Sequence, residues 1–160
     1  MKAVALALIA LAACSGSTPE QPMPFNHAVH VARQGVDCTT CHPGATTAAQ
    51  AGLPAIAVCL SCHMRPQGDP PSVAEARVRA IAAAGGPFRW TQVTRNAGHV
   101  YFSHRAHTVF AEMSCESCHG AVQEWIEPPS APNPALVDMD ACMSCHRERG
   151  VSNECKTCHR

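Results

Sequence analysis

The longest uninterrupted apolar run lies at the N-terminus, where Ala3 to Ala13 follow Lys2. This run is too short to cross a bilayer as a helix, which takes about 20 residues. A basic residue followed by a short apolar run is typical of a secretory signal, and we therefore predict a signal peptide at 1–13. Export would place the mature chain outside the cytoplasm.

The residues around the end of this run indicate how it is processed. Leu11-Ala12-Ala13-Cys14 resembles a bacterial lipobox, in which the cysteine is lipidated and becomes the new N-terminus. Ser15 to Pro19 is typical of a flexible tether, which we extend over 14–24. Ordinary signal cleavage beside an incidental cysteine is the alternative. The lipidated form predicts a protein of the bacterial periplasm or cell envelope, anchored to a membrane through Cys14.

One long helix is predicted in the rest of the chain. Ser72-Val73-Ala74-Glu75 is a capping box, the following residues to Ala84 are rich in alanine, and Gly85-Gly86-Pro87 ends the helix. We expect this helix to pack as a connector without a catalytic role. A stiff proline-rich loop at 127–134 and a short helix over 137–146 complete the prediction.

A five-residue pattern, C-x-x-C-H, occurs five times and uses every cysteine except Cys14. It is the attachment signature of c-type haem, in which two thiols bond the porphyrin and the histidine binds its iron. Structural zinc and thioredoxin-like redox chemistry also use C-x-x-C, but neither needs a histidine directly after the second cysteine. The predicted attachment cysteines and proximal histidines are Cys38, Cys41, His42; Cys59, Cys62, His63; Cys115, Cys118, His119; Cys142, Cys145, His146; Cys155, Cys158, His159.

The chain has ten histidines, so five remain outside the motifs, one for each predicted iron. A second imidazole can fill the sixth iron position, and we predict this distal role for the spare set. Met113, Met139 and Met143 are alternative sulfur ligands, although methionine is more often a packing residue. The candidate distal ligands are His27, His30, His99, His104 and His107.

Four of these histidines belong to an internal repeat. Phe25-x-His27-x-x-His30 precedes Cys38, and Phe102-x-His104-x-x-His107 precedes Cys115, with the same offsets from histidine to cysteine. On a helical turn the two imidazoles of each pair lie on one side and can serve two neighbouring irons. The repeat divides a pentahaem domain at 25–160 into a two-haem half (25–64), a connector (65–98) and a three-haem half (99–160).

Composition supports a core built from cofactor. Lys and Arg total 12, as do Asp and Glu, so nothing indicates nucleic-acid binding. Aromatic residues make up only 4% of the chain, too few for an ordinary core of this size. We predict a multihaem cytochrome c fold in which five haem c groups form the interior, with short α-helices, much irregular coil and little or no β-structure.

The paired F-x-H-x-x-H segments and the haem motifs resemble class III, or cytochrome c7-like, multihaem cytochromes. Residues 20–27, 90–93, 99–104 and 155–160 are similar to the pentahaem subunit of bacterial alternative complex III. This resemblance implies bis-histidine irons, supports His99 as a ligand, and implies His27 for the haem at Cys38 and His104 for that at Cys115. The family's subunit has an N-terminal membrane helix where this chain has the lipobox-like segment, so a free-standing lipoprotein and a subunit of a related respiratory complex both remain open.

Electron transfer is the predicted function, with redox proteins as partners, among them subunits of a membrane respiratory complex that oxidises quinol. We expect an electron-transfer protein and no catalytic residues of its own. A multihaem reductase of a small molecule such as nitrite is the alternative; it would need an open iron position. A zinc-bound interaction module is a third hypothesis.

Overall fold

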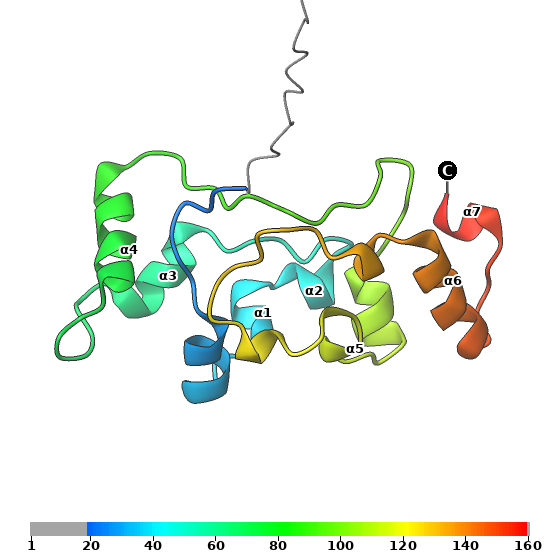
Figure 1. Ribbon diagram of the computed structural model, residues 1–160, viewed down its shortest axis with the longest axis horizontal. Helices are drawn as coiled ribbons and strands as arrows, with labels where there is room; N and C mark the ends of the chain where they lie inside the picture. The colour runs from blue at the N-terminus through cyan, green and yellow to red at the C-terminus, as the bar shows by residue number, and fades with distance from the viewer. Residues whose placement is uncertain (1–18, 160) are drawn as a thin grey trace, which may run out of the picture.

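The computed structural model describes residues 19–159, and in this range it contains short helices joined by long irregular segments. No strand is formed there; an isolated β-bridge joins Val100 and His159. Figure 1 shows the helices spread along the longest axis of an elongated molecule, in an order that differs from their order in the chain. The elements are η1 (Ala28–Arg33), α1 (Cys38–Cys41), α2 (Gly44–Thr47), α3 (Ile56–His63), α4 (Val73–Ala84), η2 (Ala106–Phe110), α5 (Glu116–His119), η3 (Val122–Glu124), η4 (Pro134–Leu136), α6 (Met139–Glu148) and α7 (Cys155–Cys158). The predicted class of fold is confirmed.

Helix α4 begins and ends where the sequence predicts. The Ser72 hydroxyl accepts a hydrogen bond from the Glu75 backbone N–H at 3.1 Å, and Gly85 adopts the left-handed conformation with φ of 66°. The other half of the capping box, a bond from the Ser72 N–H to the Glu75 side chain, does not form. The Glu75 carboxylate instead accepts hydrogen bonds from Gln67 and Arg79. The helix packs against α3.

The short helix near the C-terminus starts two residues later than predicted. Pro134 opens the 3-10 turn η4, which includes Leu136, and Asp138 then caps α6 by accepting a hydrogen bond from the Asp140 N–H at 3.0 Å. An aspartate with extended backbone at this position is a strong N-cap, so the helix cannot begin at Val137 as predicted. The loop before it, 127–133, has no regular structure, as predicted.

Between residues 19 and 159 the protein side chains alone do not form a continuous core. Among the described residues, the buried apolar side chains are Met23 and Val78. Large apolar side chains are instead open to solvent, including Phe110 at 70% and Ile126 at 69% exposure. A chain of this size normally buries a substantial apolar interior, so this polypeptide has apolar surface left for something else to cover.

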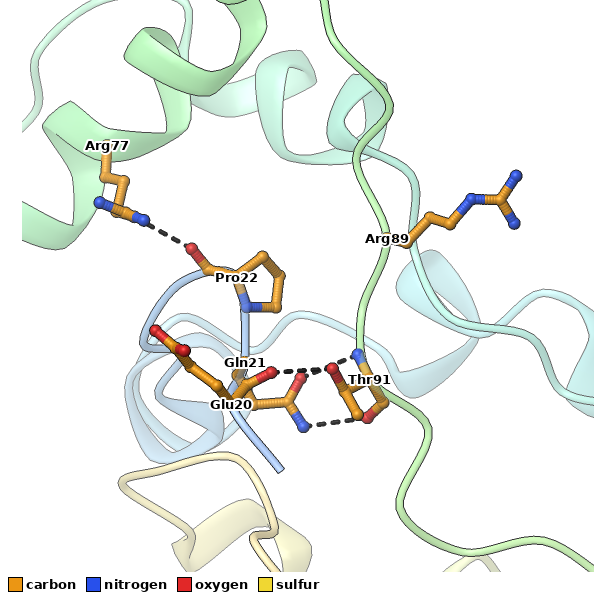
Figure 2. A pocket seen from close by; sticks show the side chains of 6 residues that line it. All are labelled: Glu20, Gln21, Pro22, Arg77, Arg89 and Thr91. Carbon is orange, nitrogen blue, oxygen red and sulfur yellow. Dashed lines mark hydrogen bonds between the residues drawn. The ribbon is translucent and has the colours of Figure 1, made fainter. Parts of the chain in front are cut away.

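The connector is fixed to the first part of the chain by hydrogen bonds and ring contacts. The Trp90 indole donates to the Pro54 carbonyl at 3.1 Å, and its ring meets that of Phe25 edge-on at 6.1 Å. Figure 2 shows a shallow pocket where the N-terminal segment crosses the connector: Gln21 and Thr91 exchange two hydrogen bonds, and Arg77 donates to the Pro22 carbonyl. This pocket contains no predicted site residue.

The segments on either side of the connector are joined by hydrogen bonds. The Ala28 N–H donates to the Trp125 carbonyl at 3.0 Å, while Thr108 donates its hydroxyl to the Ala45 carbonyl at 2.6 Å. Each histidine-pair segment is therefore held against the other part of the chain. Within residues 19–159 no helix is both long and apolar enough to traverse a membrane. The predicted signal peptide, Cys14 and the start of the tether lie outside the described residues.

Candidate haem-binding site

Each C-x-x-C-H motif folds as one short helical turn or as part of a longer helix. The motifs lie on α1, α3, α5, α6 and α7. Helical backbone puts residues i and i+3 on the same side, so both cysteines of a motif face the same way. The ten motif cysteines form no disulfide, and all are at least partly accessible. The thiols are therefore available for bonding to a porphyrin.

For four of the five motif histidines, the imidazole ring lies close to the ring of a spare histidine. Two imidazoles that bind one metal ion from opposite sides, with bonds of about 2 Å, have ring centroids about 6 Å apart. The observed separations lie close to this value. They are 6.0 Å for His30 and His63, 6.3 Å for His104 and His119, 6.2 Å for His107 and His146, and 5.3 Å for His99 and His159.

The remaining spare histidine, His27, lies close to the remaining motif histidine, His42. Burial, and then the charge of His42, lower the pKa of His27. The same residue meets the Trp125 ring edge-on at 6.0 Å. The structure thus brings every spare histidine near one motif histidine, and no two spare histidines share a partner.

The hydrogen bonds of the imidazoles leave the second ring nitrogen free. In five of these histidines Nδ1 lies 2.7–3.0 Å from a backbone carbonyl oxygen. A carbonyl only accepts, so Nδ1 carries the proton and Nε2 keeps its lone pair, which is the state that binds a metal. The five are His30, His42, His104, His107 and His146. These residues fit an iron porphyrin, whose iron could accept one imidazole nitrogen from a motif histidine and one from a spare histidine.

A zinc site requires a different ligand set. Structural zinc takes four protein ligands, whereas a porphyrin supplies four nitrogens to its own iron. Among the described residues, no group of three or more His, Cys, Asp or Glu side chains is positioned to hold a metal ion. The arrangement of paired histidines therefore favours haem over the zinc-bound module.

The predicted repeat is confirmed as one structural unit used twice. The Phe25 ring stacks on His30 at 4.5 Å and meets His27 edge-on at 4.8 Å. The corresponding distances from Phe102 are 4.6 Å to His107 and 4.8 Å to His104. In both copies the second histidine lies at a π-helical turn, η1 or η2, rather than a regular α-helix. The phenylalanine fixes the orientation of both imidazoles.

The two histidines of each repeat face different motifs. His27 and His104 lie by the motif that follows them directly, at α1 and α5. His30 and His107 face the next motif along the chain, at α3 and α6. His99, which precedes the second repeat, faces the last motif at α7. One helical turn thus connects two neighbouring sites.

Contacts between cysteines give the spatial order of the motifs. Burial, then repulsion and a hydrogen bond from Cys115, raise the pKa of Cys38, so α1 adjoins α5. Burial, and then the charge of a second cysteine, likewise raise the pKa of three more thiols. The second cysteine is Cys62 for Cys41, Cys145 for Cys118 and Cys158 for Cys142, so α3 adjoins α1, α6 adjoins α5, and α7 adjoins α6. The order in space is α3, α1, α5, α6, α7, a single unbranched row that can be followed in Figure 1. The second motif of the sequence therefore lies at one end of the row and the fifth at the other.

Glu75 is a residue of this site that sequence reasoning assigned only to the capping box. Burial would raise the pKa of its carboxyl, but hydrogen bonds from Arg79 and the Gln67 N–H, together with the nearby His63 imidazole, outweigh burial and hold that pKa below its ordinary value. The carboxylate lies 3.5 Å from Nδ1 of His63. Glu75 lies eight residues after Gln67, which donates to it, but nothing in the sequence places its side chain beside a motif histidine.

These features define a c-type cytochrome with several haems. Residues 100–160 match the family described as cytochrome c7 and related cytochrome c. Over 167 aligned positions the chain is 32% identical to the multiheme cytochrome c subunit of menaquinone reductase from Nitratidesulfovibrio vulgaris strain Hildenborough. The alignment covers 90% of this chain and 79% of that protein. The chain belongs to the multihaem c-type cytochromes, binds haem c and transfers electrons.

Proposed function

We propose that this chain holds five haem c groups, each bonded to two motif cysteines and ligated by one motif histidine and one spare histidine. The observation that carries this proposal is the one-to-one matching of spare and motif histidines, with ring separations of 5.3–6.3 Å in four pairs. His27 and His42 make the fifth pair. When bound, each haem supplies an iron that cycles between the ferric and ferrous states.

The residues of the chain hold and orient these groups. The thiols fix each porphyrin to its helix, and Nδ1 hydrogen bonds to carbonyls fix the tautomer and rotation of the ligating imidazoles. The single row of motifs favours electron flow from end to end, between the α3 and α7 ends. A reductase of a small molecule would need an open iron position, and a spare histidine is present for each motif.

We further propose that the protein works as a lipid-anchored subunit of a quinone-linked membrane complex facing the periplasm. The name of the similar protein assigns it to a menaquinone reductase, and the sequence resembles the pentahaem subunit of alternative complex III. Both support a membrane partner that exchanges electrons with quinone. Cys14 would provide the anchor.

The proposal is tested on the mature, exported protein. Intact mass is expected to show five covalent porphyrin additions, and a pyridine haemochrome spectrum should give the same stoichiometry. The near-infrared magnetic circular dichroism of the oxidised protein should contain only bis-histidine bands. Fewer porphyrins, or a histidine–methionine band, would contradict the ligand set.

The partner is tested separately. Mild detergent extraction of the native membrane, followed by affinity capture of the tagged chain, should recover integral membrane subunits in fixed stoichiometry. Recovery of the lipoprotein alone would support a free-standing carrier and contradict the complex.

The reductase alternative has its own test. Carbon monoxide binding to the unaltered reduced protein would contradict full axial ligation and favour a reductase.

A further inference from the structure

Glu75 is a buried acidic side chain in a protein that buries very little. It is 7% exposed, and the other buried residues in the described range are Met23 and Val78. Burying a carboxylate costs free energy unless charged or hydrogen-bonding partners compensate it. Such a group in a chain with almost no protein core needs an explanation.

One oxygen of Glu75 receives all of its interactions. Oε1 accepts a hydrogen bond of 2.8 Å from the Gln67 N–H and another of 2.8 Å from the Arg79 guanidinium. The same oxygen lies 3.5 Å from Nδ1 of His63. Arg79 is on the next turn of α4, so the helix itself supplies the group that holds the carboxylate. Gln67 lies on the loop between α3 and α4, which fixes Glu75 against the end of α3.

His63 differs from the other motif histidines whose Nδ1 contacts are known. His42 and His146 place Nδ1 at hydrogen-bond distance from the neutral carbonyls of Gly52 and Ser152, at 2.7 and 3.0 Å. Nδ1 of His63 is buried and makes no conventional hydrogen bond, so the nearest acceptor is the charged Glu75 oxygen. If Nε2 binds iron, Nδ1 carries the proton and points toward a carboxylate.

We propose that Glu75 is a positioning residue that lowers the reduction potential of the haem held by Cys59, Cys62 and His63. The inference rests on the proposed function, since it requires a haem at this motif. A carboxylate beside the proximal Nδ1–H makes the imidazole a stronger electron donor and stabilises the ferric ion, which carries more positive charge. Arg79 holds the carboxylate in place and offsets part of its charge.

The position of this motif in the row gives the tuning a consequence. α3 is the terminal motif of the row, beside α1 and opposite α7. A low potential at the terminus makes the first inward step downhill for an electron that enters there. A lowered potential at this motif therefore favours electron entry at the α3 end and exit at the α7 end.

The experiment compares full-length, haem-loaded variants by redox titration. The titration is monitored by electron paramagnetic resonance, in which this haem differs from three others because the His30 and His63 rings are inclined at 71°, whereas the pairs containing His99, His104 and His107 are within 29° of parallel. Loss of its signal in His30→Ala separates it from the haem between His27 and His42. In Glu75→Gln, which keeps the side chain's size and removes its charge, we expect the ferric-to-ferrous equilibrium of this haem to shift about tenfold toward ferrous, or about 59 mV. Glu127→Gln, which removes an exposed charge from the 127–134 loop, is the matched control and should leave every haem unchanged.

A second variant separates tuning from folding. Arg79→Gln removes the offsetting charge and should shift the same haem in the opposite direction, toward ferric. A structural role alone would move both variants the same way or move neither, and either result overturns the proposal. If the wild-type protein carries no porphyrin on Cys59 and Cys62 by peptide mass, the proposed function fails instead. If five porphyrins are present and Glu75→Gln leaves all potentials unchanged, only the inference about Glu75 fails.

Discussion

The imidazole rings of His104 and His119 lie parallel, with 4° between their planes and 6.3 Å between their centroids. The first comes from a helical turn and the second from the end of α5, fifteen residues later. This is the spacing that two axial ligands of one metal ion require. Parallel alignment depends on the Phe102 ring and on the Ala49 carbonyl, which accepts from His104 Nδ1.

Removing a spare histidine should open one iron and no other. His107 faces His146, so His107→Ala leaves the haem at Cys142 and Cys145 with a vacant sixth position. We expect the reduced variant to bind one carbon monoxide per molecule, while the unaltered protein binds none. Val109→Ala, at a partly exposed position on the same turn, is the control and should bind none. An unaltered carbon monoxide titration in His107→Ala would contradict this pairing.

The ring angles predict two kinds of electron paramagnetic resonance signal. The angle between axial imidazole planes controls how the iron d orbitals split, since each ring donates π-density in one direction. The pair at 71°, His30 and His63, should give a highly anisotropic low-spin signal, whereas the nearly parallel pairs should give rhombic signals. His30→Ala should abolish the anisotropic signal alone. Its survival in that variant would show that another pair produces it.

The phenylalanines of the repeat should contribute similarly to stability because their geometry is the same. Phe25→Ala and Phe102→Ala each remove a ring stacked on a histidine at 4.5 and 4.6 Å. We expect each to lower the free energy of unfolding of the haem-loaded protein by about 1–2 kcal/mol, less than for a fully buried ring. Guanidinium titration measures this. Phe110→Ala, at a 70% exposed ring, should cost about 0.5 kcal/mol or less, and equal losses in all three variants would argue against the stacking.

Without haem the chain should not fold. With only Met23 and Val78 as buried apolar residues in the described range, the polypeptide cannot offset its conformational entropy. Protein made without haem attachment should show little helical circular dichroism and narrow amide dispersion by nuclear magnetic resonance. A cooperative thermal melt of the haem-free chain would disprove the idea that porphyrin replaces the core.

Lipid attachment should depend on Cys14. Cys14→Ala removes the thiol that the lipobox-like segment offers for acylation. We expect the variant to lack the acyl mass and to leave the membrane fraction after a wash that dissociates partner subunits, with its haem content unchanged. Normal membrane retention of the variant would indicate that a protein partner, not a lipid, holds the chain. Cell fractionation with haem staining gives the measurement.

Sequence reasoning succeeded where a signal is local. The repeat of phenylalanine and two histidines and the boundaries of α4 depend on residues only a few positions apart. It missed the start of α6, since the competition between Val137 and the Asp138 cap is decided by the preceding turn at Pro134. It also missed the position of the Glu75 carboxylate, which contacts His63 of α3 and Gln67 of the following loop rather than completing the capping box.

The sequence by itself determined that this is a multihaem cytochrome c, because covalent haem attachment needs adjacent residues in a fixed order. It also determined that spare histidines and motifs are equal in number. Only the tertiary structure decided which histidine faces which motif, that the second motif ends the row, and that Glu75 lies beside His63. These relations join residues up to sixty positions apart, such as His99 and His159, and long-range packing sets them rather than local spacing.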